Sequence, residues 1–145
     1  MLEVLLLHSS TMVKAGVFLI LKLAPCLGWG NAEYGMVNYA GIMVMAVGGI
    51  TFLLASFAAI SQSNAKRVLA YSTIANLGLI VVCGGIGTAA AVWAGIMLII
   101  FHAVTKSLLF LCVGTAEHNI GSRNIEDMDG LFDRMPRLAA CMMIG

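Results

Sequence analysis

Three basic side chains lie inside apolar runs of this sequence, where a charge is costly. The stretch FHAVTKSLLFL, residues 101–111, places His102 and Lys106 four residues apart, and the stretch LLLHSSTMVKAG places Lys14 in another apolar run. A charge at the centre of a membrane-spanning helix costs roughly 2.5 to 3.5 kcal/mol by insertion scales. We therefore expect these side chains to face the interior of a helix bundle, beside water or polar partners.

The spacing of these basic residues suits a proton relay. Residues three or four apart share a helix face, so His102 lies beside Lys106, and Ser10 and Thr11 flank Lys14. An amine taken out of water gives up its proton more easily, and histidine titrates near neutral pH. The alternative is a static ion pair of each lysine with a carboxylate. No Asp or Glu lies at the centre of a predicted span, so that acid would come from another segment or subunit.

Two further basic residues have two interpretations each. His8 lies one or two turns inside the first apolar run, where it either caps or packs, or joins a proton path. Lys66 opens a predicted helix as part of a basic pair, which is the usual interfacial anchor. A polar stripe continues beyond it through Ser72 and Asn76, so a water path along this helix is the alternative.

The acidic residues lie toward the C-terminal end. Glu117 follows Lys106 by eleven residues, close to three turns, and would face the same way if the helix continued that far. It is either a solvated loop acid or a carboxylate at the cytoplasmic mouth of a proton path. A second group of acids is either a solvated face or a docking surface for a partner. This group consists of Glu126, Asp127, Asp129 and Asp133.

Composition predicts an all-α, polytopic membrane protein. Of 145 residues, 61% are hydrophobic and 10% charged, with a mean hydropathy of +0.99, so polar surface is too scarce to cover a globule. At about 20 residues per span, the length allows four full crossings and the start of a fifth in one transmembrane domain. The helices are expected at about 2–23, 37–60, from 66 to the glycines of GGIG, and 88–114, with a fifth opened by Pro136.

Glycines and polar residues set the expected details of these elements. Gly41, Gly48 and Gly49 suit close helix contact in lipid, whereas the three glycines of GGIG predict a turn. A loop is expected at about 115–136, in which NIEDMDG would form one short surface helix with Asn124 as its cap and Gly130 as its stop.

The distribution of basic residues predicts the orientation in the membrane. Two connections on one side carry all the loop Lys and Arg residues, and the two opposite loops carry none. By the positive-inside rule, the basic connections and the N-terminus of the first helix are cytoplasmic. These basic residues are Lys66, Arg67, Arg123, Arg134 and Arg137.

Several functional classes are disfavoured by composition. The four cysteines stand alone in apolar surroundings, without metal-ligand spacing, so we expect inert, buried thiols and no metal site. No nucleotide, catalytic or cofactor motif appears, so no catalytic residue or cofactor is expected in this chain. A net charge of +1 without a basic cluster argues against nucleic acid as a partner. The opening residues do not form a secretory signal.

Three segments carry a family resemblance. In order, LLLHSSTMVKAGVFLILK, AKRVLAYSTIANLG and FHAVTKSLLFLCVGT closely resemble the antiporter-like proton-channel subunits shared by respiratory complex I, Mrp cation/proton antiporters and membrane-bound hydrogenases. The stretch LLFLCVGTAEHNIGSRNIEDMDGL is most similar to the large membrane subunit of energy-converting nickel–iron hydrogenases. The match covers nearly all of this chain but a minority of a full family member, so the chain is expected to be a fragment.

The resemblance implies a larger membrane arm of two inverted repeats, each with a half-channel, joined by an axis of lysines, histidines and one glutamate. Lys14 matches the lysine on the last helix of the first repeat, and His8 matches a histidine beside it. Lys66 matches the lysine of the KR-x-L-A-Y-S motif. His102 and Lys106 match the H-x-x-x-K pair of the second repeat.

The expected function is that of a non-catalytic subunit that moves protons, or sodium ions, in a redox-driven complex of the hydrogenase or complex I type. Its partners would be other membrane subunits, a hydrophilic redox module reached through them, and the bilayer of a prokaryotic cell (inner) membrane. One alternative is an Mrp-type secondary cation/proton antiporter driven by an ion gradient. Another is a structural membrane anchor whose buried bases never titrate.

Overall fold

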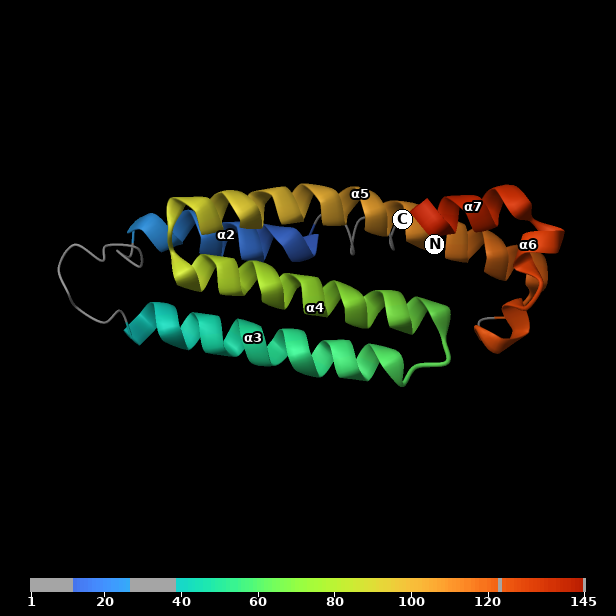
Figure 1. The fold of residues 1–145 in the computed structure, drawn as a ribbon, viewed down its shortest axis with the longest axis horizontal. Helices are drawn as coiled ribbons and strands as arrows, with labels where there is room; N and C mark the ends of the chain where they lie inside the picture. Colours follow the sequence, from blue (N-terminus) through green and yellow to red (C-terminus); the bar gives the residue numbers. More distant parts are fainter. Residues whose placement is uncertain (1–11, 27–38, 123, 145) are drawn as a thin grey trace.

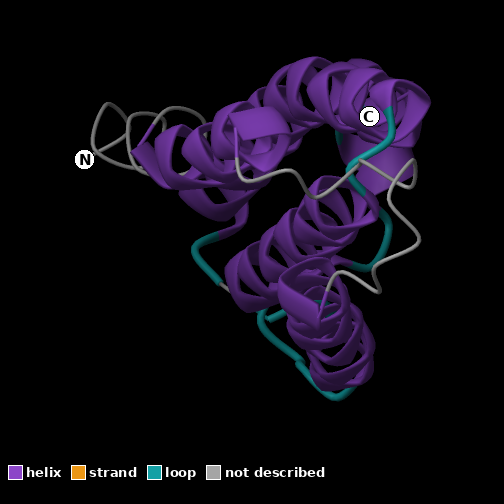
Figure 2. Cartoon of the chain, turned by 90° about the vertical axis from the view of Figure 1, so that its left-hand side faces the viewer, coloured by secondary structure: helices purple, strands orange, loops and turns teal. Residues whose placement is uncertain are grey.

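The computed structural model describes residues 12–26, 39–122 and 124–144, and these form helices joined by short connections (Figures 1 and 2). Within them there is no strand, and one isolated bridge pairs Asn64 with Asn124. The predicted all-α fold is confirmed. The elements are α2 (Val13–Cys26), α3 (Tyr39–Ile60), α4 (Ala65–Ile86), α5 (Ala89–Ile120), the 3₁₀ helix η3 (Glu126–Met128), α6 (Leu131–Arg134) and α7 (Pro136–Ile144).

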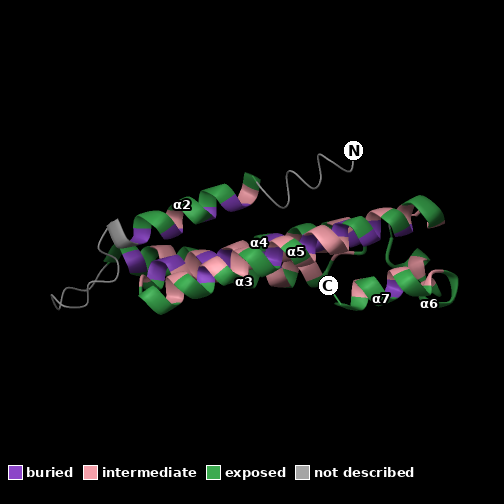
Figure 3. Ribbon diagram, turned by 90° about the horizontal axis from the view of Figure 1, so that it is seen from above, coloured by how far each residue is buried: buried purple, intermediate pink, exposed green. Residues whose placement is uncertain are grey.

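Three helices, α3, α4 and α5, are long and apolar enough to cross a membrane. Helix α4 is central, because it contacts α3, α5 and α2 (Figure 1). The buried residues of α2 face the bundle and its opposite side is exposed (Figure 3). Exposed side chains along α3 are large and apolar, as expected for a surface covered by lipid or by other helices. They include Met43, Val47, Leu54 and Phe57.

Helices α3 and α4 pack backbone to backbone, through glycines. A Cβ atom on Gly48 would lie 2.7 Å from the carbonyl oxygen of Gly78, and one on Gly85 would lie 2.6 Å from the backbone nitrogen of Met45. No side chain fits into these contacts. Gly49 is different, because a Cβ atom there would meet nothing within 4 Å. The prediction of close glycine contact is confirmed for Gly48, whereas Gly49 plays no part in it.

A second apolar cluster joins α2 to α4 and α5. Val17 and Leu21 of α2 pack with Ile80 of α4, and the last two side chains are almost completely buried. Gly95 of α5 leaves room for Leu21, since a Cβ atom on this glycine would lie 3.2 Å from both Leu21 methyl carbons. This packing fixes the axial position of α2 against the other two helices.

The glycine-rich turn was predicted too early. Helix α4 continues through Gly84 and Gly85 to Ile86, because both glycines are buried at helix contacts instead of lying in a loop. The helix stops at Gly87, whose φ of 69° is the left-handed conformation that favours glycine at a helix end. Thr88 then caps α5 by accepting a hydrogen bond from the Ala91 backbone N–H at 3.3 Å.

Helix α5 is longer than predicted at its C-terminal end. It runs to Ile120, so residues 115–120 belong to the helix and not to the loop expected from 115 to 136. With 32 residues, α5 is about 48 Å long, whereas the hydrocarbon core of a bilayer is about 30 Å thick. Part of the helix therefore extends beyond the hydrocarbon, where polar residues do not interrupt it. Gly121, at a φ of 79°, provides the stop.

The first helix also ends later than predicted. Helix α2 continues past Leu23 and includes Pro25 in its last turn, where proline removes one backbone hydrogen bond at most. The expected residues 2–11 of this helix lie outside the part of the chain that the structure describes. Helix α3 ends at Ile60 as predicted.

The segment after α5 differs in detail from the prediction. NIEDMDG forms only the single turn η3, preceded by Ile125 instead of Asn124. Gly130 does not end this turn but precedes α6, with a φ of 74°. Pro136 opens α7, as predicted. The cysteines are also not uniformly buried: Cys112 is buried, Cys83 is intermediate and Cys141 is exposed.

Replacing Gly48 with alanine should destabilise the bundle, because the added methyl group would press on the backbone of α4. Overpacking of this kind costs about 1–3 kcal/mol. We expect Gly48→Ala to lower the midpoint of thermal unfolding in detergent, followed by circular dichroism. Gly49→Ala is the matched control and should leave the midpoint unchanged or raise it, since alanine favours helix. Equal effects of the two substitutions would contradict the packing described here.

Candidate functional site

The three basic side chains singled out in the sequence are all buried in the structure. Lys14 of α2 is 5% exposed, and His102 and Lys106 of α5 are 5% and 6% exposed. His102 lies within electrostatic reach of both lysines. Helix α2 begins level with the middle of α5 (Figure 1), and Lys14 lies in its first turn. The three groups thus form one buried cluster of basic side chains, which we call the Lys–His cluster.

Lys106 contacts the central helix through a hydroxyl group. Its Nζ atom donates a hydrogen bond to the Oγ atom of Ser72 on α4. The Ser72 hydroxyl donates in turn to the carbonyl oxygen of Leu69 at 3.0 Å. A hydroxyl group can accept and donate at once, so Ser72 accepts from Lys106 while it donates to Leu69. Within the described residues, neither Lys106 nor Lys14 forms an ion pair.

A partly polar cavity lies beside Lys106 and His102. Its volume is about 290 Å³, room for several water molecules. Asn76 of α4 and Thr105 of α5 add polar groups to its wall, and the Asn76 side chain donates to the Ser72 carbonyl oxygen at 2.9 Å. Apolar residues complete the lining, namely Leu98, Phe101 and Leu109.

Two buried nitrogens have no hydrogen-bond partner among the described residues. They are Nζ of Lys14 and Nε2 of His102. A buried polar group without a partner costs about 1–3 kcal/mol, more when charged. Since His102 lines the cavity, water there can reach its ring. Lys14 does not line this cavity, and both nitrogens are buried, so proton exchange with its water requires a movement that exposes them.

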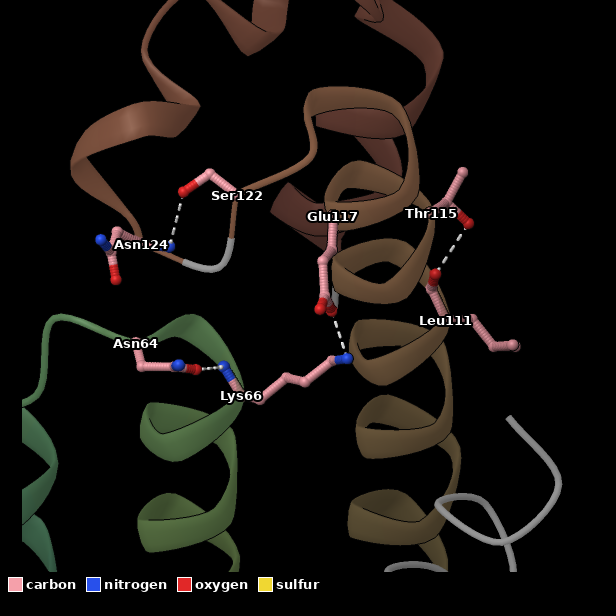
Figure 4. A network of polar contacts seen from close by, with 7 residues as sticks. All are labelled: Asn64, Lys66, Leu111, Thr115, Glu117, Ser122 and Asn124. Atoms are coloured by element: carbon pink, nitrogen blue, oxygen red, sulfur yellow. Dashed lines mark hydrogen bonds and ion pairs between the residues drawn. The ribbon is translucent and has the colours of Figure 1, made fainter. Parts of the chain in front are cut away.

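Lys66 and Glu117 form an ion pair between the first turn of α4 and the last turns of α5 (Figure 4). Both side chains are partly exposed. Glu117 is therefore a helical residue and not a loop acid, which fulfils the condition under which it would face the same way as Lys106. Asn64 caps α4 by accepting from the Lys66 backbone N–H at 3.1 Å.

The two connections beside this ion pair are tied together. The Ile125 backbone N–H donates to the carbonyl oxygen of Ser63 at 2.9 Å, next to the bridge between Asn64 and Asn124. The Lys66–Glu117 pair thus lies at the end of the bundle where the two connections predicted to be cytoplasmic meet (Figure 4). His8, Ser10 and Thr11 lie outside the described residues.

The sequence did not identify Ser72 as the partner of Lys106, nor Thr105 as part of the cavity. The available signal was the spacing of Ser72 and Asn76, four residues apart on one face of α4. The sequence does not show the register of α4 against α5, which decides that Ser72 meets Lys106. Among the described residues, no group of three His, Cys, Asp or Glu side chains could hold a metal ion.

Three candidate membrane spans in one helix bundle define the chain as a multi-pass integral membrane protein, and this bundle buries a cluster of basic side chains. The family model described as NADH:quinone oxidoreductase/Mrp antiporter, transmembrane, matches residues 1–145. The chain belongs to this family, and the predicted resemblance to antiporter-like subunits is confirmed.

Three relatives illustrate the match. A protein of Rhizobium meliloti that is named as a K(+)/H(+) antiporter subunit is 41% identical over 138 residues, covering 95% of this chain and 13% of that protein. One of Staphylococcus aureus named as the antiporter subunit mnhA2 is 37% identical, covering 95% and 18%. NADH-ubiquinone oxidoreductase chain 5 of Paracentrotus lividus is 39% identical, covering 97% and 20%. The chain spans no more than a fifth of the length of these three relatives.

The Lys66–Glu117 ion pair should contribute modestly to holding α4 against α5. Because both groups are partly exposed, we expect a coupling energy of about 1 kcal/mol or less. A double-mutant cycle with Lys66→Met and Glu117→Gln, read out by thermal unfolding of the protein, measures it. The double variant should lose less stability than the sum of the single variants. Strict additivity would mean that the pair contributes nothing.

Proposed function

We propose that this chain is the part of a proton-translocating membrane subunit in which protons move between Lys14, His102 and Lys106. The observation that carries the proposal is the burial of these three bases without an ion-pair partner among the described residues, two of them, His102 and Lys106, beside a partly polar cavity. A permanently charged cluster of this kind would be unstable in an apolar interior. Groups that can release their protons avoid that cost.

Mutual repulsion provides the coupling between these sites. Like charges close together in an apolar interior disfavour each other, so a proton that arrives on one base promotes release from the next. His102 lies within electrostatic reach of both lysines and can pass protons between them through water. The hydroxyl of Ser72 accepts a hydrogen bond from Lys106 while its own proton is donated to the Leu69 carbonyl oxygen, so Ser72 holds the amine in place.

The cytoplasmic end of the path is proposed to be the Lys66–Glu117 pair. Glu117 follows Lys106 by about three turns of the same helix, and Lys66 precedes Ser72 by less than two turns of α4. Both residues thus stand on the helices that carry the Lys106–Ser72 contact. His8, which matches a family histidine beside Lys14, is assigned to the proton path as well.

The driving force is proposed to come from attached subunits that carry out redox chemistry, in a complex of the hydrogenase or complex I type in a prokaryotic membrane. This chain would be a non-catalytic subunit of that assembly. The similarity to NADH-ubiquinone oxidoreductase chain 5 supports the complex I type, and the stretch LLFLCVGTAEHNIGSRNIEDMDGL is the ground for the hydrogenase assignment. We assign protons instead of sodium ions as the cargo, because amines and imidazoles bind protons.

The second candidate is an Mrp-type cation/proton antiporter subunit, driven by an ion gradient. It is favoured by the two relatives that are named as antiporter subunits. The two candidates share the Lys–His cluster and differ in what moves the charge. Genes for a hydrogenase or quinone oxidoreductase beside this one would favour the redox-driven candidate.

Replacing Lys106 with alanine should reduce proton translocation at least tenfold, because the relay loses a titratable group. Lys106→Arg should fail similarly, since a guanidinium keeps its charge and does not release its proton. The measurement is proton uptake into vesicles that contain the assembled complex, normalised to electron transfer or to cation exchange. A complex that assembles poorly with Lys106→Ala but keeps its proton stoichiometry would instead support the structural-anchor alternative.

Lys14 allows a comparison within one helix. Lys14→Ala should reduce proton translocation at least tenfold, because it removes one of the buried titratable groups of the relay. Lys22→Ala is the matched control, since Lys22 is an exposed lysine of the same helix α2. The same vesicle assay should show near-normal translocation with Lys22→Ala. Equal loss in both variants would assign the effect to the charge of α2 as a whole.

A further inference from the structure

The side chain of Asn76, in the middle of α4, is oriented by its hydrogen bond to the backbone. Its Nδ2 atom donates to the Ser72 carbonyl oxygen at 2.9 Å. A carbonyl oxygen can only accept, so the nitrogen of the amide group, and not its oxygen, must point to the backbone. The Oδ1 atom forms the other arm of the amide and can only accept. Because Asn76 lines the cavity beside Lys106, this oxygen is available to the cavity.

The hydroxyl groups near Lys106 also direct their protons to the backbone. Ser72 donates to the carbonyl oxygen of Leu69 at 3.0 Å, and Thr105 donates to that of His102 at 3.5 Å. A hydroxyl group has one proton and two lone pairs, so each of these groups can still accept. The polar side chains of α4 and α5 around Lys106 therefore offer oxygen acceptors to the cavity.

We propose that Asn76 is a positioning residue of the relay, whose Oδ1 atom accepts a hydrogen bond from water in the cavity and holds that water beside Lys106. This role rests on the proposed function. A bound water molecule needs two to four polar partners, which Asn76, Thr105 and Lys106 provide in this wall. The oxygen of the water accepts from Lys106. When it takes up the lysine proton, one of its own protons passes to the next water of the cavity.

A neutral acceptor suits this position, because the bases around it must release their protons. Among the described residues, His102 and Lys106 of α5 line the same cavity, and Lys14 of α2 lies within electrostatic reach of His102. Helix α3 contributes no acidic or basic side chain. A carboxylate in place of Asn76 would pair with Lys106 and hold the proton there. An amide orients water without fixing the charge.

The first test replaces Asn76 with two residues of similar shape. Threonine can donate to the carbonyl oxygen four residues earlier and keep a lone pair for water, whereas valine lacks the hydroxyl group. We expect Asn76→Val to reduce proton translocation in the vesicle assay about tenfold and Asn76→Thr to keep most of it. Equal translocation by the two variants, with folding checked by thermal unfolding, would overturn the proposal.

Thr73→Val is the matched control. The Thr73 hydroxyl donates to the Leu69 carbonyl oxygen at 2.8 Å, but Thr73 does not line the cavity. Near-normal translocation is expected for this variant. A loss as large as that of Asn76→Val would assign the effect to a hydrogen bond within α4 and would contradict the role of the cavity oxygen.

Lys106→Ala, measured in parallel, separates this inference from the proposed function. If Lys106→Ala loses translocation and Asn76→Val keeps it, the proposed function stands and the role of Asn76 is wrong. If Lys106→Ala keeps translocation, the proposed function fails and the role of Asn76 fails with it.

Asn76→Asp gives a readout that a merely structural role would not change. The carboxylate has the size of the amide and stabilises the ammonium form of Lys106, so proton release requires a higher pH. We expect the pH profile of translocation to move to higher pH by about one unit, with Asn76→Thr keeping the profile of the unmodified protein. An unchanged profile of a well-folded Asn76→Asp variant would overturn the proposal.

Discussion

The structure depends on one electrostatic constraint, the placement of two amines and an imidazole in an apolar bundle without an acid among the described residues to neutralise them. Such groups are tolerated only where polar partners or water reach them or where they release their protons. The bundle supplies the Ser72 hydroxyl for Lys106 and a cavity for His102. The packing of α2, α3 and α4 positions these partners.

The central helix α4 has two different faces, one that packs against α3 and one that supplies polar groups to α5. Its glycines lie against α3, where Gly78 and Gly85 permit backbone contact that no side chain could replace. Its polar residues, Ser72 and Asn76, are directed to α5. The closely packed α3–α4 pair therefore holds the Ser72 hydroxyl against Lys106, while α2, packed through Leu21, carries Lys14 within electrostatic reach of His102.

Much of the fold follows from the sequence, because apolar runs of span length and charged connections leave few alternatives to a membrane bundle. The burial of the three basic residues was also predictable, from the cost of a charge in such runs. Local rules failed where tertiary contacts decide. Gly84 and Gly85 resemble a turn in the sequence but serve helix packing, and the polar residues 115–120 extend α5 because they lie beyond the hydrocarbon.

Contacts between helices could not be predicted, because they depend on the register of one helix against another. The pairing of Ser72 with Lys106 and of Lys66 with Glu117 joins residues far apart in the chain. Periodicity gives the face of each helix but not its height relative to a neighbour. The cysteines also show this, since Cys112 and Cys141 line one open hollow between α5 and α7 although their sequence surroundings suggested isolated thiols.

The central claim is that the buried amines titrate during turnover. Its most direct test is the protonation state of Lys106 in the assembled complex, observed by nitrogen-15 NMR of labelled lysine in lipid with Lys106→Arg used to assign the signal. The account predicts that this nitrogen exchanges between ammonium and neutral amine under turnover conditions. A nitrogen that stays an ammonium ion throughout turnover, bound to one carboxylate, would contradict it.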